Sequence, residues 1–406
     1  RCTGVGKCRA GVSGTFMCPS YLATRDEKDV TRGRARILQE AANSQLIKAI
    51  DSPEVLEALD LCLACKACSA DCPAGVDMAR YRSEALYRTY RGRVRPLSHY
   101  TLGWLPRLTR VTARVPGLAT VANAVMSVGP LRSLAFRIIG LDPRRGMPAL
   151  QSGTFTAWAR KRSLLAGSVP ATASPDPATD ARERGGAQAS SDSAREREGA
   201  TASSMADSPI LSGPRDPSGR PYALVWADSF SQTLDDAGAR AVVDVLEANG
   251  FAPIVAPDAC CGLTWITTGQ LEGAKKHLAS LLGVLAPFAA SGIPIVGVEP
   301  SCTAVLRDDL MDLLPEDPRS ALVSSATRTL AEVLSALPAS AQRLPSLEGV
   351  EIVAQPHCHH YSVMGWDTDQ ALLESLGARV TRLEGCCGLA GNFGMEAGHY
   401  DLSVAV

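Results

Sequence analysis

The sequence predicts a mixed fold, in which a small α-helical domain is followed by an α/β domain built of two repeats. Three observations support this prediction. Seven of the 13 cysteines precede residue 90, apolar runs alternate with helical patterns after residue 220, and the tetrapeptide CCGL occurs twice in that second half. A chain of 406 residues is long enough for two or three domains that each bury a core.

Charge and hydropathy exclude several classes of protein. The chain has 41 basic and 42 acidic residues, so no excess of charge indicates a nucleic-acid partner. No apolar run is long enough to cross a membrane, and no signal peptide opens the sequence. Thirteen cysteines without an export signal predict a cytoplasmic protein with reduced thiols, and their clustering indicates metal ligands.

Composition divides the chain into four parts. Residues 1–90 hold the first seven cysteines around a helical stretch. Residues 91–165 carry thirteen Arg or Lys against one acid, Asp142, and are predicted to form a basic helical connector. Residues 166–220 consist mainly of small, polar and charged side chains, which predicts a disordered linker. Residues 221–406 form the predicted α/β domain.

The α/β domain is read from its alternating patterns. Strands are predicted at "YALVWAD", "APIVAP", "IPIVGVEP" and "VEIVAQP", and helices at "DDAGARAVVDVLEANG", "ATRTLAEVLSAL" and "DQALLESLG". Such alternation favours a parallel sheet. Because the sequence does not begin with Met and stops within a helical pattern ("MEAGHYDLSVAV"), we expect a truncated second repeat and a longer polypeptide.

The densest cysteine motif is Cys62-x2-Cys65-x2-Cys68-x3-Cys72-Pro73. This spacing matches the bacterial ferredoxin run, in which three cysteines hold one iron–sulfur cluster and the cysteine before Pro holds the other. A zinc site is the alternative interpretation, since paired CxxC motifs also suit tetrahedral zinc.

A second, incomplete copy of this motif opens the chain as Cys2-x5-Cys8-x9-Cys18-Pro19, with Val5 in place of the middle cysteine. Crossed ligation predicts a [4Fe–4S] cluster on Cys62, Cys65, Cys68 and Cys18, and a second cluster on Cys2, Cys8 and Cys72. Three thiolates favour [3Fe–4S] for the second cluster. A [4Fe–4S] cluster with a non-cysteine ligand, or no second cluster, are the alternatives.

The predicted fold class is therefore an α-helical two-cluster ferredoxin-like domain followed by an α/β domain of two CCG repeats. The incomplete motif resembles the iron–sulfur subunits of succinate dehydrogenase and fumarate reductase, where a non-cysteine residue at this position accompanies a 3Fe centre. The CCG units resemble the cysteine-rich domain of heterodisulfide reductase, the glycolate oxidase iron–sulfur subunit and the corresponding subunit of anaerobic glycerol-3-phosphate dehydrogenase.

The resemblance to the CCG family implies metal or cluster ligands among Cys260, Cys261, Cys302, Cys358, Cys386 and Cys387. The first unit departs from the family pattern, because "ADSFS" has no leading cysteine and Val305 replaces the last one. A tight turn with buried thiols is the structural alternative. In "HCHH", His357, His359 and His360 are either further ligands or hydrogen-bond partners of cluster sulfurs and nearby carbonyls.

The order of the motifs resembles the C-terminal half of large FAD-linked oxidases that act on D-2-hydroxy acids such as D-lactate or D-2-hydroxyglutarate. The matching stretches are "RCTGVGKCRAG", "MCPSYLATRDEKDVTRGRARIL", "CLACKACSADCPAGVDMARYRSE", "EPSC", "PHCHH" and "GCCGLAGNFGME". The resemblance implies an oxidoreductase that relays electrons from FAD to a quinone, a cytochrome or another acceptor. No dinucleotide-binding motif occurs here, so FAD is expected on an absent domain or a partner, and this chain alone should not oxidise substrate.

Two other functions remain open on the sequence: thiol–disulfide redox catalysis at the CCG sites, as in heterodisulfide reductase, and a zinc-stabilised interaction module. The basic connector has two interpretations of its own. It is either a set of two or three helices packed on the ferredoxin-like domain, with Arg facing solvent or an acidic flavin domain, or a peripheral contact with the inner face of the membrane, anchored by Trp104 and Trp158.

Overall fold

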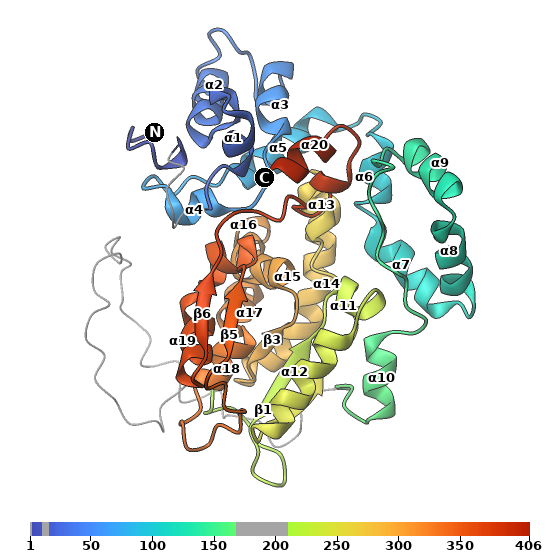
Figure 1. The fold of residues 1–406 in the computed structure, drawn as a ribbon, viewed down its shortest axis with the longest axis vertical. Helices are drawn as coiled ribbons and strands as arrows, with labels where there is room; N and C mark the ends of the chain where they lie inside the picture. The colour runs from blue at the N-terminus through green and yellow to red at the C-terminus, as the bar shows by residue number, and fades with distance from the viewer. Residues whose placement is uncertain (1, 10–15, 168–209) are drawn as a thin grey trace.

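The computed structural model describes residues 2–9, 16–167 and 210–406. Figure 1 shows three parts: a helical unit above, an α/β unit below, and a helical arm along one side. No described helix is both long and apolar enough to pass through a bilayer. The expectation of a mixed fold, with helices and small parallel sheets, is thus confirmed.

The N-terminal unit is a set of short helices around the first cysteines. Its elements are η1 (Lys7–Arg9), α1 (Pro19–Thr24), η2 (Glu27–Asp29), α2 (Thr31–Asn43), α3 (Pro53–Asp60), α4 (Ala67–Asp71) and α5 (Met78–Thr89). Helix α3 begins at the Ser52-Pro53 pair, because proline lacks the backbone N–H that a first helical turn leaves unpaired. Val30, Val55 and Met78 form its core together with the buried Cys18, Cys62 and Cys68.

The arm consists of α6 (Leu97–Thr101), α7 (Leu105–Arg114), α8 (Leu118–Ser127), α9 (Gly129–Ile139) and α10 (Phe155–Lys161). Arginines of the arm and of the segment just before it bind the α/β unit: Arg95 donates to the carbonyls of Thr268 and Gly269, and Arg110 pairs with Asp258 at 2.7 Å. The arm therefore packs against the α/β unit rather than mainly on the N-terminal unit, and part of its charge is neutralised there.

The larger sheet is four-stranded and fully parallel, in the order β2–β1–β3–β4. The strands are β1 (Tyr222–Trp226), β2 (Ala252–Val255), β3 (Ile295–Gly297) and β4 (Thr327–Arg328). The predicted helix "ATRTLAEVLSAL" differs here, since Thr327 and Arg328 form β4 and the helix begins only at Leu330. The reason is a capping box, in which Thr329 and Glu332 satisfy each other's backbone N–H groups.

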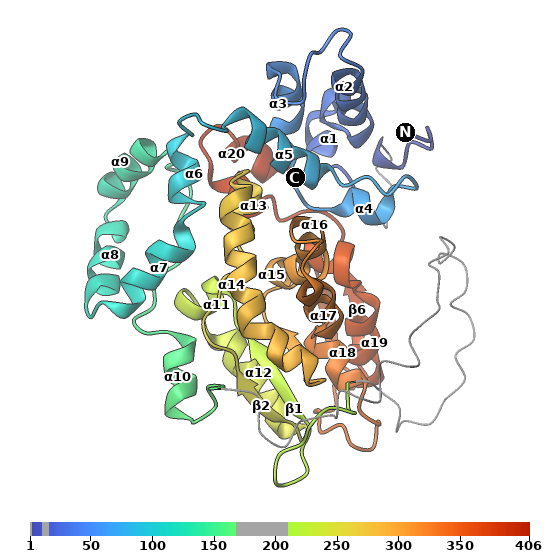
Figure 2. The same ribbon diagram turned by 180° about the vertical axis from the view of Figure 1, so that it is seen from behind.

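Helices cover this sheet on both sides. They are α11 (Ser229–Thr233), α12 (Ala237–Ala248), α13 (Leu263–Thr267), α14 (Leu271–Ala290), α15 (Pro300–Ala304), the π-helical turn η4 (Val305–Asp309), α16 (Leu310–Leu313), α17 (Pro318–Ala326) and α18 (Leu330–Ser335). Figure 2 shows the long helix α14 running from α13, near α5, down along the α/β unit. Leu278, Leu281 and Leu285 on α14 are fully buried, which fixes this helix against the sheet.

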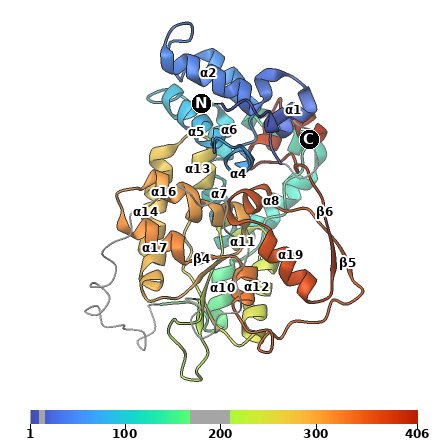
Figure 3. The same cartoon turned by 90° about the vertical axis from the view of Figure 1, so that its left-hand side faces the viewer.

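The second sheet contains two parallel strands, β5 (Glu351–Ala354) and β6 (Arg379–Arg382), which lie beside α19 (Asp367–Ser375) in Figure 3. Alternate residues of both strands are exposed, so only one face of this sheet is covered. The C-terminal part adds the turn η5 (His360–Met364), η6 (Phe393–Met395) and α20 (Tyr400–Ala405).

The described ends of the predicted linker belong to the α/β unit. The N–H of Ala166 donates to the carbonyl of Val255 at 2.9 Å, and Ile210 and Leu211 pack against the core beneath β1. Helix α10 joins the same core through Phe155, which is fully buried. The rest of the predicted linker, residues 168–209, lies outside the described residues.

Candidate metal centre

Four cysteines from two separate places in the sequence line one cavity. They are Cys18, Cys62, Cys65 and Cys68, the set predicted to hold the [4Fe–4S] cluster. Cys18 precedes α1, Cys62 follows α3, Cys65 lies just before α4, and Cys68 lies in the first turn of α4. The chain turns sharply around them, since Cys18, Ala64 and Lys66 all have positive φ angles between 50° and 59°. The local backbone thus points the cysteines toward a common space.

The surroundings of these sulfurs suit an iron–sulfur cluster. The Thr31 N–H donates to Cys18 Sγ at 3.1 Å, and the Thr31 hydroxyl lies 2.8 Å from the same sulfur. The Met78 N–H donates to Cys68 Sγ at 3.4 Å. Burial raises the pKa of the Cys18 thiol to about 11, so a bound cation is needed to hold it as a thiolate at neutral pH. Backbone donors to sulfur are the contacts by which a protein tunes such a cluster.

The cysteines predicted to hold the second cluster are more exposed. Cys8 interacts electrostatically with Cys2 and Cys72, and burial is the largest effect that raises its pKa. Cys2 is exposed, and Val5 has 67% of its surface exposed. The three cysteines are thus neighbours at the surface of the N-terminal unit. Residues 10–15 of this segment lie outside the described residues, and the type of cluster stays a prediction.

The CCG cysteines lie beyond the carboxyl ends of parallel strands. Cys260 and Cys261 follow β2, Cys302 follows β3, Cys358 follows β5, and the pair Cys386 and Cys387 follows β6. Carboxyl ends of parallel strands form the usual ligand-binding edge of an α/β sheet. All six cysteines thus lie after strand ends, although β2 and β3 are separated by β1 in their sheet whereas β5 and β6 are direct neighbours.

Both CCG turns have the same geometry. The Gly262 N–H donates to Cys260 Sγ at 3.4 Å, and the Gly388 N–H donates to Cys386 Sγ at 3.3 Å. Both glycines have positive φ, 76° and 70°, which favours glycine at this position.

The two groups of CCG cysteines differ in exposure. In the first group, Cys260, Cys261 and Cys302 are buried. Cys261 lies between the other two and interacts with each of them through its thiol. In the second group, Cys387 is exposed, and its hydrogen bond with Cys386 lowers the pKa of Cys387 to about 5. The first group therefore fits the structural alternative of buried thiols better than the second does.

The second CCG group adjoins the four-cysteine cavity. Burial raises the pKa of Cys65, and the next largest cause is its proximity to Cys358. Cys386 also interacts electrostatically with Cys65. The turn η5 makes the direct contacts, because Ser362 Oγ donates to the carbonyl of Cys65 at 3.3 Å and the Tyr361 hydroxyl donates to Asp71 at 2.9 Å. Tyr361 and Ser362 therefore cover the cysteine loop, which comprises residues 62–72, from almost three hundred positions further along the chain.

Each histidine of "HCHH" has a protein partner. His359 Nε2 lies 3.0 Å from the Ala64 carbonyl, inside the cysteine loop. His357 Nε2 lies 3.1 Å from the Ser301 hydroxyl, and His360 Nε2 lies 2.9 Å from Asp369. These contacts match the interpretation in which histidines bond to nearby groups, and ligation by a histidine stays a prediction. Within residues 2–9, 16–167 and 210–406, no three His, Cys, Asp or Glu side chains are grouped so as to hold a single metal ion.

A buried ion cluster joins the cysteine loop to the α/β unit. Lys66 Nζ lies 3.0 Å from Asp77, 2.7 Å from Asp308 and 2.8 Å from Asp309. Only 4% of the Lys66 side chain is exposed. Burial alone would lower the pKa of Lys66, but the three carboxylates raise it, so the lysine stays charged. Sequence reasoning missed this cluster, because Asp308 and Asp309 lie more than 240 positions from Lys66.

A second charged contact ties the C-terminal segment to α3. His399 Nε2 lies 3.3 Å from Asp60, and its Nδ1 lies 3.4 Å from Glu396. Burial lowers the pKa of His399, but these two carboxylates outweigh it and raise the pKa to about 9. The histidine therefore carries a positive charge at neutral pH.

Comparisons with known proteins indicate the class of iron–sulfur proteins. Residues 1–76 match the family described as a 4Fe-4S dicluster domain. Over 99% of its length, the chain is 26% identical to D-2-hydroxyglutarate dehydrogenase of Pseudomonas putida, and over its whole length it is 23% identical to the Escherichia coli enzyme of that name. It covers 38% and 39% of these relatives, so it spans less than two fifths of their length.

A second kind of relative matches a shorter stretch. One subunit of the anaerobic glycerol-3-phosphate dehydrogenase of Escherichia coli is 28% identical over 173 residues, which is 41% of this chain and 42% of that protein. No solved structure matches the chain significantly. Both kinds of relative are dehydrogenases, or parts of them, by name.

Proposed function

We propose that this chain is the iron–sulfur electron-transfer portion of a flavin-dependent D-2-hydroxyacid dehydrogenase. The observation that carries the proposal is the cavity lined by Cys18, Cys62, Cys65 and Cys68. The dicluster match over residues 1–76 and the similarity to D-2-hydroxyglutarate dehydrogenases over the whole chain support it. These four cysteines are proposed to hold a [4Fe–4S] cluster, and Cys2, Cys8 and Cys72 a [3Fe–4S] or second [4Fe–4S] cluster.

A bound cluster supplies one-electron transfer, and the chain supplies its setting. Buried cysteines at one cavity fix the position of the cluster, and the Thr31 and Met78 N–H groups stabilise negative charge on two sulfurs. These features favour uptake of an electron at the site.

The proposed partners are inferred from the part of the relatives that this chain does not cover. About three fifths of each D-2-hydroxyglutarate dehydrogenase has no counterpart in this chain, so FAD and the substrate pocket are proposed to lie on a further domain or subunit. The electrons are proposed to leave to a quinone, a cytochrome or another acceptor. The substrate is proposed to be a D-2-hydroxy acid, and the chain alone is expected not to oxidise it.

Spectroscopy of the chain, purified without oxygen, tests the proposal. We expect iron, acid-labile sulfide and a brown visible absorption that dithionite bleaches. Cys62→Ser should reduce the iron content and the absorption, whereas Ser69→Ala, next to Cys68 in α4 but not lining the cavity, should leave both unchanged. Zinc in place of iron, with no visible absorption, would refute electron transfer and favour the zinc-stabilised module.

The arm provides the proposed contact with a membrane surface. Val111, Val121, Leu131, Leu134 and Ile138 on α7–α9 are each at least half exposed. Apolar side chains among arginines are typical of helices that lie on anionic lipid. Trp104 is 39% exposed, but Trp158 packs against Phe155 and is not available as an anchor. Co-sedimentation with vesicles should depend on anionic lipid, and equal binding to neutral vesicles would refute this contact.

Thiol–disulfide redox catalysis at the second CCG group is the second candidate function. The observation in its favour is the exposed Cys387, which lies beside Cys386 and close to the four-cysteine cavity. Reductive cleavage of a disulfide substrate by the reduced chain, lost in Cys387→Ser but kept in Cys260→Ser, would support it. Equal activity in both variants would exclude it.

A further inference from the structure

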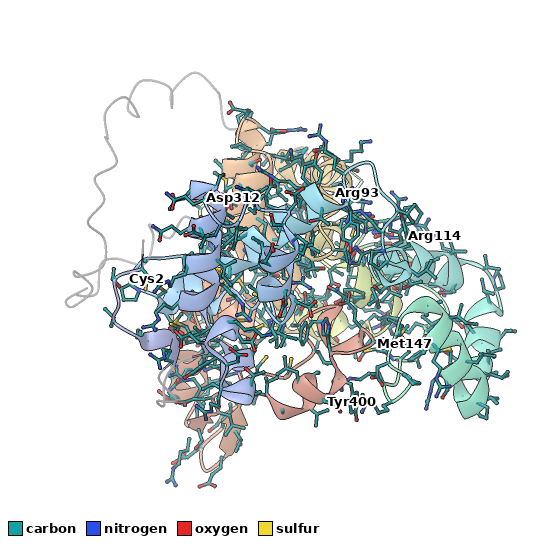
Figure 4. The ribbon with its side chains drawn as sticks, turned by 90° about the horizontal axis from the view of Figure 1, so that it is seen from above. Cys2, Arg93, Arg114, Met147, Asp312 and Tyr400 are labelled. Atoms are coloured by element: carbon teal, nitrogen blue, oxygen red, sulfur yellow. The ribbon has the colours of Figure 1, made fainter. Side chains whose placement is uncertain are left out.

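The arm encloses a cavity that the proposed function does not use. Its volume is about 600 Å³, and α6, α7, α8, α9 and residues 141–150 form its wall. Most of the wall is apolar, including Leu105, Ala122, Met126, Phe136 and Met147. Cavities of this size and character typically hold a small organic ligand. Figure 4 shows Met147 on the arm side of the molecule, far from Cys2.

Hydrogen bonds outside the helices hold the wall in place. Asn123 Nδ2 donates to the Leu150 carbonyl at 2.9 Å, and the Leu150 N–H donates to Asn123 Oδ1 at 2.9 Å. The N–H of Asp142 donates to the Met395 carbonyl at 3.0 Å, which ties the loop to the C-terminal segment. The loop that closes the cavity is therefore attached at both of its ends.

One buried nitrogen of an arginine in the wall lacks a partner among the described residues. The Nε of Arg132 is buried and has no hydrogen-bond partner among the described residues. Asp142, the one acid of the arm, already binds Arg144. The hydroxyls of Thr109, Thr112 and Ser127, which also line the cavity, donate to carbonyls of their own helices. Arg132 is thus the donor in this wall that a ligand can satisfy.

We propose that this cavity binds an amphiphile with an apolar body and one oxygen-bearing head group, and that the head accepts a hydrogen bond from Arg132. Apolar walls favour the body, and a guanidinium prefers a carboxylate or carbonyl oxygen. A quinone and a fatty acid share this chemistry. Leu108, which lines the cavity and is 51% exposed, marks its opening to solvent. The proposal concerns ligand binding and stands whether or not the chain transfers electrons.

Two probes distinguish the sources of such a ligand. Decylubiquinone is titrated against the full chain by quenching of tryptophan fluorescence, and cis-parinaric acid by its own fluorescence. Arg132→Gln removes a charge-assisted hydrogen bond and is expected to weaken binding by about ten- to a hundredfold. Arg137→Gln, an exposed arginine on the same helix, is the matched control and should bind as the wild type does.

A second pair of variants tests the cavity itself. Ala122→Phe fills the space and should abolish binding, whereas Ala124→Phe points to solvent from the same helix and should not. Circular dichroism checks that both fold. Binding of either probe with this pattern supports the proposal, and the probe that binds identifies the ligand as a quinone or a fatty acid. The proposal would be overturned if neither probe bound the wild type, or if Arg132→Gln and Ala122→Phe each bound the probe as tightly as the wild type does.

Discussion

Replacing Lys66 by Met should destabilise the protein strongly, because it leaves three carboxylates around an apolar side chain. Asp77, Asp308 and Asp309 lie within 3.0 Å of Lys66 Nζ, and only 4% of the lysine side chain is exposed. Removing one partner from a buried ion pair costs about 3–5 kcal/mol. Arg80 also pairs with Asp308, so the lower end of that range is expected.

The measurement is the urea concentration at the midpoint of unfolding, monitored by tryptophan fluorescence. The m-value is expected to stay unchanged, so that a shift in midpoint reports a change in stability. Lys276→Met, at an exposed position on α14, is the control and should change the free energy of unfolding by less than about 0.5 kcal/mol. Asp309→Asn should cost less than Lys66→Met, because burial already raises the pKa of Asp309 and the folded state gains little from its charge. Equal midpoints for Lys66→Met and Lys276→Met would refute this reasoning.

Three further changes have defined outcomes. The pKa of His399 is about 9 in the folded protein and about 6.5 unfolded, so its contribution to stability is full below pH 6.5 and is lost as pH rises through 9. His399→Gln should therefore flatten the fall in urea midpoint between pH 6.5 and 9.5. Gly388→Ala should lower the free energy of unfolding by more than about 1 kcal/mol, because its Cβ would lie 1.9 Å from the Ser403 carbonyl oxygen at a φ of +70°; an unchanged midpoint would count against the turn. Thr31→Val removes the hydroxyl 2.8 Å from Cys18 Sγ and should make the reduction potential of the proposed [4Fe–4S] cluster more negative, measured by a dithionite titration, while a potential equal to wild type would exclude this role.

Local pattern predicts the elements of this fold well, and it predicts their contacts poorly. The strands that begin at Tyr222, Ala252 and Ile295 and the grouping of Cys62, Cys65 and Cys68 are present, because each depends on residues close in sequence. Thr329 shows where local patterns are insufficient. Its capping box starts the helix at Leu330, so Thr327 and Arg328, which were predicted as helix, form strand β4.

The long-range features had no signal in the sequence. Lys66 appeared only as a residue between two cysteines, and nothing marked Asp308 or Asp309 as its partners. Likewise, the approach of Cys358 to Cys65 and the cavity around Arg132 arise from packing between separate segments. The arginines of the connector were expected to face solvent or a flavin domain, yet several bind carbonyls and acids of the α/β unit.

The contact of η5 with the cysteine loop has a consequence for how the protein is made. Asp71 receives its hydrogen bond from Tyr361, 290 positions later, and Ser362 reaches the carbonyl of Cys65 across 297 positions. During synthesis, the cysteine loop emerges from the ribosome long before the segment that covers it, and contacts of such separation form slowly. We therefore expect the loop to stay uncovered, and accessible to iron for the proposed cluster, until η5 is made and closes it.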